Sequence, residues 1–361
     1  MLDTALLLVL AALPVPPPAA GPPVDLLSPV VHDVTMSIDV GPARDTLTLL
    51  AGGPDAPQAL QRLKGSRAFH QALSRGGGNP DDVLGRLVSV AAGTPDPLLG
   101  GYSGRAAVFR KILDALETDG TPAAMLEARR IAALLPSSRP VTARLRLVPL
   151  FGLSRFGDVV VESDGETTWL FADLPGLAPE GNAEVVPREV VFSVLRTAAS
   201  ESWTRLFAPF RVPPAWPEPK VPDFDALLAR TAADGPATMF LFADEFFPLG
   251  TMFEEPIQRS FDRWNTAAEV LLDPKAKEAT RREALAAATA RGEFWSRHSS
   301  VVGVKMTEVL LRSAGAARYL EALAAGPRAV AALYLEVTRK GKEPALGKAA
   351  RKALEAKPPS S

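Results

Sequence analysis

The spacing of apolar residues predicts amphipathic helices over the first third of the chain. Between residues 43 and 135, apolar side chains recur every three or four positions, as at Val83, Leu87 and Val90. Residues at this spacing lie on one face of a helix, and burial of that face stabilises it. Turn-forming segments rich in Gly, Pro, Asn and Asp interrupt the pattern at residues 76–80, 93–97 and 120–122. We therefore expect short helices up to about residue 136.

The pattern changes to that of a small sheet between residues 143 and 172. Arg144 and Arg146 alternate with leucines, which is the period of a half-buried strand. Two short apolar runs then flank Asp164 and Gly165, a dipeptide typical of a tight turn between antiparallel strands. The sequence therefore predicts a small antiparallel or mixed sheet after the first helices.

Helical spacing returns at Pro187 and continues to Thr338, which predicts a helical C-terminal lobe. The first helix of this lobe is expected to end in the proline-rich stretch from 209 to 222. Further helices are expected over residues 224–242, 257–272, 275–291, 298–313 and 316–338. Lys and Arg outnumber Glu beyond Thr338, so residues 339–361 are expected to form a basic, flexible tail. The predicted fold class is α+β and mainly helical.

The N-terminus has the pattern of an export signal. An apolar run over residues 6–13 precedes a segment rich in Pro, Ala and Gly over residues 14–23, and the run is too short to span a bilayer. We expect residues 1–23 to be a signal peptide and residues 24–338 a single domain, exported to the periplasm or the extracellular space, with no membrane span in the mature protein. The alternative is a cytoplasmic protein that starts at Met36, because no basic residue precedes the apolar run. In the chain that starts at Met1, His32 would lie in an unstructured leader.

Composition and motif spacing exclude several classes of function. The 361 residues carry 40 Lys and Arg against 41 Asp and Glu, whereas nucleic acids are bound by clustered positive charge, so we expect no nucleic-acid partner. The chain has no cysteine, which excludes disulfides, thiolate metal sites and cysteine nucleophiles. Ser299 and Ser300 follow His298, but neighbours on a helix do not face each other as a base and a nucleophile must. We expect no catalytic residue, no bound metal and no cofactor.

Three short stretches carry a resemblance to a known family. Residues 37–43, 145–161 and 300–306 resemble, in turn, the opening strand and helix, the strand pair beside the substrate cleft, and a closing helix of a bacterial family of gluzincin-type zinc peptidases. The resemblance covers most of the chain, from about residue 37 to residue 338. It implies a small sheet packed on a gluzincin-like helical core.

In that family the long helix after the sheet carries the HExxH motif, in which two histidines one helical turn apart bind zinc and the glutamate activates the bound water. The resemblance places this motif at residues 197–201, where Thr197 and Glu201 stand in place of the histidines and Ala198 in place of the glutamate. The family's third ligand, a Glu in an E-G-x-A segment, corresponds to Asp234. The resemblance therefore implies the scaffold of a peptidase without its zinc or its catalysis.

Three interpretations of these positions stay open at this point. Thr197 and Glu201 belong to a solvated helix face, or they are remnants of a former zinc cleft, or Glu201 and Asp234 hold a hard cation such as Ca²⁺ or Mg²⁺ in a metal-assisted hydrolase. We favour a noncatalytic relative of zinc metallopeptidases that binds a peptide or protein in the former cleft, where the edge of the sheet would accept an added strand. The other alternative is a plain helical interaction scaffold. Four aromatic residues are candidate cleft contacts, although such residues more often belong to the core: Phe151, Phe156, Trp203 and Trp216.

Overall fold

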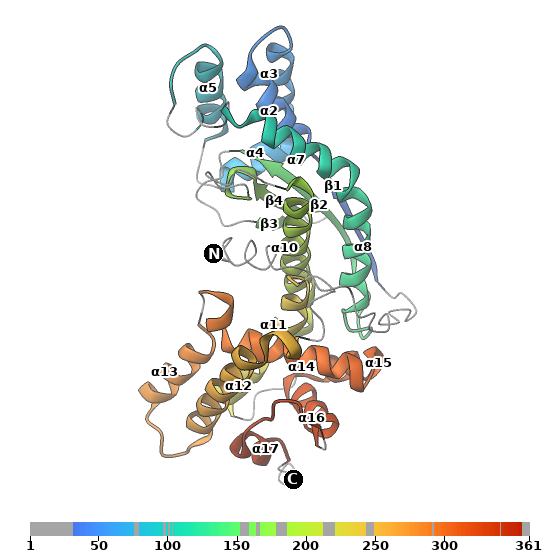
Figure 1. Cartoon of the computed structure of the whole chain (residues 1–361), viewed down its shortest axis with the longest axis vertical. Coiled ribbons are helices and arrows are strands. Elements are labelled where there is room, and N and C mark those ends of the chain that lie inside the picture. The colour runs from blue at the N-terminus through green and yellow to red at the C-terminus, as the bar shows by residue number, and fades with distance from the viewer. Residues whose placement is uncertain are drawn as a thin grey trace. The chain divides into compact units, whose positions relative to one another are not determined.

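The described chain packs as two compact units (Figure 1). The computed structural model describes residues 32–75, 79–96, 99, 102, 104–151, 159–163, 167–177, 186–211, 221–242, 249–290, 292–339 and 341–355. The first unit comprises residues 34–129 and 142–202, and the second comprises residues 32–33, 130–141 and those from 203 onward. The sequence predicts a single domain over residues 24–338 instead. Periodicity shows that a side chain is buried, but it does not show which of two cores buries it.

A four-stranded sheet organises the first unit. Its strands are β1 (Asp33–Ile38), β2 (Thr142–Leu150), β3 (Val159–Ser163) and β4 (Thr167–Asp173), in the order β1-β2-β4-β3. β2 and β4 are parallel, whereas β3 and β4 form an antiparallel pair. Two backbone hydrogen bonds join β1 to β2, from Asp33 N to Val141 O and from Asp39 N to Leu147 O. The residue numbers rise together along both strands, which shows that β1 and β2 are parallel.

The predicted fold class, mainly helical α+β with a small sheet, is therefore confirmed, and so is the hairpin around residues 164–165. The antiparallel option for the sheet is wrong for β1, β2 and β4, which are parallel. The alternation of apolar and polar residues reports which face of a strand is buried, but it carries no information on strand direction. The helices between β1 and β2 supply the long crossover that a parallel pair requires.

Helices cover the apolar face of this sheet. The residues buried on these helices are the apolar ones at the helical spacing seen in the sequence. Val191 and Val194 on the longest of them are fully buried, as are Phe109 and Ile112 on another. Asn79 caps a helix by accepting a bond from the backbone N–H of Asp81. The helices are α2 (Gly41–Ala51), α3 (Ala56–Gly65), α4 (Arg67–Arg75), α5 (Pro80–Ala91), α7 (Ala106–Thr118), α8 (Gly120–Ala133), α9 (Leu174–Leu177) and α10 (Pro187–Phe207).

Beyond residue 221, the described part of the second unit is built mainly of helices. Its α-helices are α11 (Pro222–Met239), α12 (Gly250–Leu272), α13 (Glu278–Ala288), α14 (His298–Ser313), α15 (Ala316–Ala325), α16 (Pro327–Thr338) and α17 (Lys348–Glu355). The single helix expected over residues 316–338 is in fact two. Gly326 adopts a left-handed φ of 110°, which ends α15, and Pro327 is the first residue of α16.

α14 is the central helix of this unit, and it crosses α11 at very short range. Every residue of α14 from Ser299 to Leu311 is buried. Gly235 of α11 and Gly303 of α14 meet at the crossing, and a Cβ atom on Gly303 would overlap the carbonyl oxygen of Thr231. The indole N–H of Trp264 on α12 donates to Thr231 Oγ1 at 2.9 Å, which joins a third helix to this contact. The crossing therefore depends on the absence of side chains at both glycines.

A closed ring of four charged groups lies beside this crossing. Lys305 Nζ lies 3.1 Å from carboxylate oxygens of both Glu308 and Glu343, and Arg312 pairs with the same two carboxylates. The backbone N–H of Leu249 also donates to Glu308. Lys305 and Glu308 are almost fully buried, so their charges are tolerated because each is paired. The ring ties the chain segment after α16 to the central helix.

The prediction of a flexible basic tail is wrong for residues 341–355. Leu346 and Ala350 are buried, the hydroxyl of Tyr334 donates to the carbonyl of Pro344, and the side chain of Asn265 bonds to the backbone of Gly347. The basic residues of α17 are exposed, whereas Ala350 is buried and the other alanines and Leu354 are half-buried. Charge count alone therefore misjudged an amphipathic helix. Residues 356–361 lie outside the described residues.

Candidate functional site

The positions that the peptidase resemblance selects are each engaged within their own unit. Thr197 and Ala198 are buried in α10, where Thr197 Oγ1 donates to the carbonyl of Ser193 one turn earlier, and Glu201 is exposed. These residues belong to the first unit, whereas Asp234 belongs to the second. Among the described residues, no group of three His, Asp or Glu side chains is arranged to hold a metal ion.

Asp234 has a structural environment of its own. Its Oδ2 atom accepts bonds from Arg230 Nε and from Ser300 Oγ, both at 2.7 Å. Arg230 lies on α11 like Asp234, so the bond from Ser300 is the one that links α11 to the first turn of α14. A carboxylate oxygen that accepts two short hydrogen bonds is already satisfied, so Asp234 functions as a link between helices in this arrangement.

The aromatic candidates that the structure describes belong to the core, so the prediction of cleft contacts is not supported for them. Phe151 is 3% exposed and packs edge to face against Phe109 at 5.0 Å between ring centroids. Trp203 is fully buried, donates its indole N–H to the carbonyl of Leu134 at 3.1 Å, and stacks on Phe207. Both rings fill interior space next to other aromatics. Phe156 and Trp216 lie outside the described residues.

A histidine–serine pair occurs in the second unit, but not with the serines adjacent to His298 in sequence. Nδ1 of His298 lies 3.3 Å from Oγ of Ser260, which is 38 residues away on α12 and fully buried. Burial, together with Arg263 and Arg259, lowers the pKa of His298. Because Ser260 is inaccessible, its hydroxyl cannot reach a substrate, and we assign the pair a packing role.

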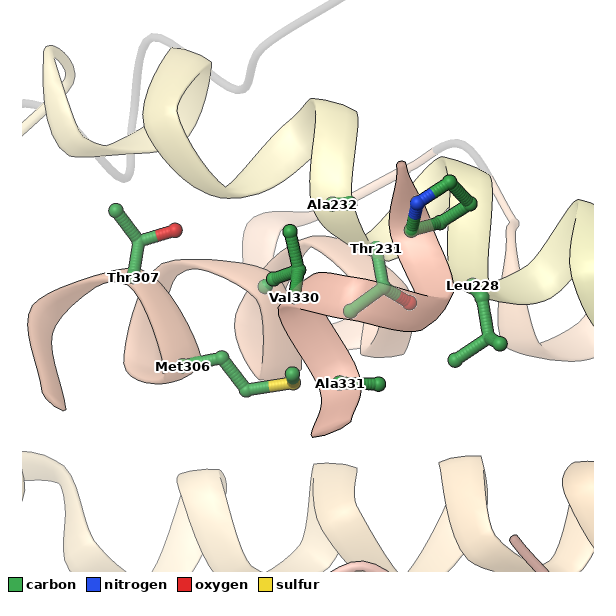
Figure 2. A pocket seen from close by; sticks show the side chains of 9 residues that line it. Leu228, Thr231, Ala232, Met306, Thr307, Val330 and Ala331 are labelled. Atoms are coloured by element: carbon green, nitrogen blue, oxygen red, sulfur yellow. The ribbon is translucent and has the colours of Figure 1, made fainter. Parts of the chain in front are cut away.

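A small cavity lies at the helix crossing of the second unit. Leu228, Thr231, Met306 and Val330 are among its lining residues (Figure 2). The space open to the centre of a water molecule is ≈ 10 Å³, which is about the minimum for one water. The cavity is therefore a packing gap and too small for an organic ligand.

The outer edge of β1 is the feature of the described chain best suited to binding. The strand order places β1 at an edge of the sheet, beside β2 on one side only. In a parallel pair, alternate residues of a strand direct their backbone groups to opposite neighbours. Asp33 and Asp39 bond to the β2 side, so Val34, Met36 and Ile38 direct their N–H and C=O groups to the outer edge. Within the described part of the chain, no strand pairs with that edge.

The two faces of this edge differ in chemistry. On the covered face Met36 is buried, while Val34 and Ile38 are half-buried. The other face is open, and it carries the exposed side chains of Asp33, Thr35 and Ser37 on β1. An extended chain added at this edge would therefore meet apolar side chains on one face and polar ones on the other.

The open face continues onto β2, where its charge is positive. The observed β1–β2 register puts Arg144 beside Thr35 and Arg146 beside Ser37. Arg146 lies over the ring of Trp169 at 5.4 Å and 3.9 Å from a carboxylate oxygen of Asp39. Arg144 is exposed, and no ion pair joins it to another described residue.

His32 holds the start of β1, which corrects the expectation that it lies in an unstructured leader. The side chain is 5% exposed. Its Nδ1 atom accepts the backbone N–H of Val141 at 3.1 Å, and its Nε2 atom lies 3.2 Å from the carbonyl of Leu135, to which it donates. Burial lowers the pKa of His32, because the charged form loses its hydration. This role is invisible in sequence, since its partners are more than 100 residues away.

Comparisons with protein-family models, with curated proteins and with solved structures find no match for this chain. The resemblance to zinc peptidases therefore stays a prediction. No helix in the described residues has both the length and the apolar character needed to cross a bilayer. The expected signal peptide lies outside the described residues, and export stays a prediction too.

Proposed function

We propose that this protein is a noncatalytic binding protein that takes up an extended peptide as an additional strand along β1. The observation that carries the proposal is the row of backbone groups at the outer edge of this six-residue strand. Backbone hydrogen bonds would supply affinity, and side chains on the two faces would supply selectivity, as in other cases of strand addition.

The composition of β1 supports this proposal. Edge strands that must not pair are commonly very short or protected by Lys, Pro or a bulge. β1 has none of these residues, and Asp33 at its first position is its only charge. His32 fixes the start of the strand through two hydrogen bonds, so the edge is held in an extended conformation before a peptide arrives. Such preorganisation lowers the entropic cost of binding.

The noncatalytic part of the proposal rests on the partners of the former ligand positions. Asp234 is held by Arg230 and Ser300, and Thr197 by the backbone of its own helix. A metal at these positions would have to break those bonds. Purified protein is therefore expected to contain substoichiometric zinc by elemental analysis and to leave casein intact.

The peptide-binding proposal is tested by blocking the edge without removing the strand. Val34 directs its N–H outward, so Val34→Pro removes a bond to an added strand while leaving the bonds to β2 in place. Val34→Thr is the matched control, because it keeps both the N–H and a β-branched side chain. Decapeptides are first selected from a random library on the wild-type protein, and their affinities for both variants are then measured by fluorescence anisotropy.

We expect the selected peptides to bind Val34→Thr like the wild type and to bind Val34→Pro at least tenfold more weakly. Equal melting temperatures of the two variants would show that the fold is preserved. Peptides that bind both variants equally, or a library that yields no binder, would refute strand addition at β1.

A further inference from the structure

The open face beside β1 carries a charge pattern that would select among extended peptides. This inference rests on the strand addition proposed above and goes beyond it to the class of ligand. Arg144 and Arg146 lie two residues apart on β2 and point to the open face, where their neighbours on β1 are only the small side chains of Thr35 and Ser37. No bulky side chain of β1 therefore lies between these guanidinium groups and a peptide strand added at the outer edge of β1.

The distances suit long charged side chains. Neighbouring strands lie about 4.8 Å apart, so a strand added beside β1 would lie about 10 Å from β2. An Arg side chain and a Glu side chain extended toward each other cover that distance, passing over Thr35 or Ser37. The hydroxyl group of Thr35 would serve as a further hydrogen-bond donor to a carboxylate, whereas that of Ser37 already donates to the carbonyl of Leu145.

The two guanidinium groups are not equally free. Arg146 is partly engaged by Trp169 and by Asp39, whose carboxylate lies at the long distance of 3.9 Å. Arg144 is exposed and has no ion-pair partner among the described residues. An acidic ligand would therefore gain most at Arg144, whereas Asp33 at the beginning of β1 disfavours a third carboxylate at that end.

We infer that the peptide taken up along β1 is acidic. Its carboxylate side chains stand at two positions separated by one other residue, and they face Arg144 and Arg146. Both carboxylates lie on the same face of the added strand, because alternate residues of a strand share a face. The residue between the carboxylates lies beside the buried Met36, and the residues that flank them lie beside the half-buried Val34 and Ile38, so all three should be apolar. The ligand pattern is thus acidic–apolar–acidic within an extended segment.

The test uses two synthetic peptides capped at both ends, Thr-Val-Glu-Val-Glu-Val-Thr and the same peptide with Lys in place of each Glu. Binding is measured by titration calorimetry to the wild type, to the double variant Arg144→Glu and Arg146→Glu, and to the double variant Arg110→Glu and Lys111→Glu. This second double variant is the control, because it changes the net charge equally on the exposed surface of α7 and not on the sheet.

We expect the wild type and the helix-surface control to prefer the Glu peptide by about tenfold, as two partly exposed ion pairs allow, and the preference to shrink with added salt. The Arg144→Glu and Arg146→Glu variant should prefer the Lys peptide. Equal binding of both peptides to the wild type, with loss of both in Val34→Pro, would refute the acidic preference and leave strand addition standing.

Two other outcomes separate the acidic preference from the proposed function. If the Glu peptide binds Val34→Pro as well as Val34→Thr, charge alone holds the peptide, and strand addition is wrong. If a version of the Glu peptide that is N-methylated at both its central Val and its second Glu binds undiminished, the same conclusion follows, because one of these two N–H groups must bond to Met36 in either strand direction. If neither the Glu peptide nor the Lys peptide binds the wild type, both proposals are overturned.

Discussion

Replacing Gly303 by Ala tests how the second unit is held together. Gly303 lies in the middle of α14, and a Cβ atom there would overlap the carbonyl oxygen of Thr231 and lie 3.0 Å from the amide nitrogen of Gly235. These atoms belong to the backbone of α11, so no side-chain rotation can relieve the overlap. The two helices would have to separate by several tenths of an ångström, which loosens every contact along their crossing.

The expected cost follows from two opposing effects. Overpacking of a rigid core costs about 1–3 kcal/mol, and the backbone contact places Gly303→Ala at the upper end of that range. Ala is a better helix former than Gly by about 1 kcal/mol, which offsets part of the cost. We expect a net destabilisation of about 2 kcal/mol. For a unit of this size the melting temperature would fall by about 4–8 °C.

Thermal unfolding followed by circular dichroism measures this effect, with Gly85→Ala as the matched control. Gly85 lies in the middle of α5, and a Cβ atom there meets nothing within 4 Å. The control should therefore show only the gain in helix propensity and be as stable as the wild type or slightly more stable. An unchanged or raised melting temperature for Gly303→Ala would show that α11 and α14 do not cross at the range described.

Two further predictions concern buried charge and titration in the second unit. Because burial lowers the pKa of His32 below its unfolded value of 6.5, the folded state binds fewer protons, and stability should be complete above that pH and fall as the pH drops through it. The melting temperature should therefore fall more between about pH 7.5 and about pH 5.5 in the wild type than in His32→Gln, while His298 contributes the same slope to both; parallel slopes would contradict the burial of His32. Lys305→Met removes one partner of a buried ion pair and should cost about 3–5 kcal/mol in urea unfolding, because the remaining carboxylates lose a cation. Arg318→Met, which breaks an exposed pair, should cost at most about 1 kcal/mol, and similar costs for the two variants would show that Lys305 is not buried.

Local chemistry made several elements predictable from sequence alone. α10 begins at Pro187 and ends at Phe207, just before the proline-rich stretch, because proline suits a first helical turn and cannot continue a helix. The hairpin between β3 and β4 likewise follows from a turn dipeptide between two apolar runs. Such features depend on residues that are close in the chain, so the sequence pattern contains the relevant information.

The features that carry the proposed function depend on partners far apart in the chain. His32 is buried only because residues 135 and 141 reach it, and Arg144 faces an open surface only because β1 pairs with β2 in a parallel register. For Trp203 and Phe151 the sequence favours the core without excluding a cleft, and the aromatic rings around them in the structure place both in the core. Periodicity determines which face of an element is apolar, whereas the direction of a strand, the partner of a helix and the exposure of an edge follow from long-range packing that no local pattern encodes.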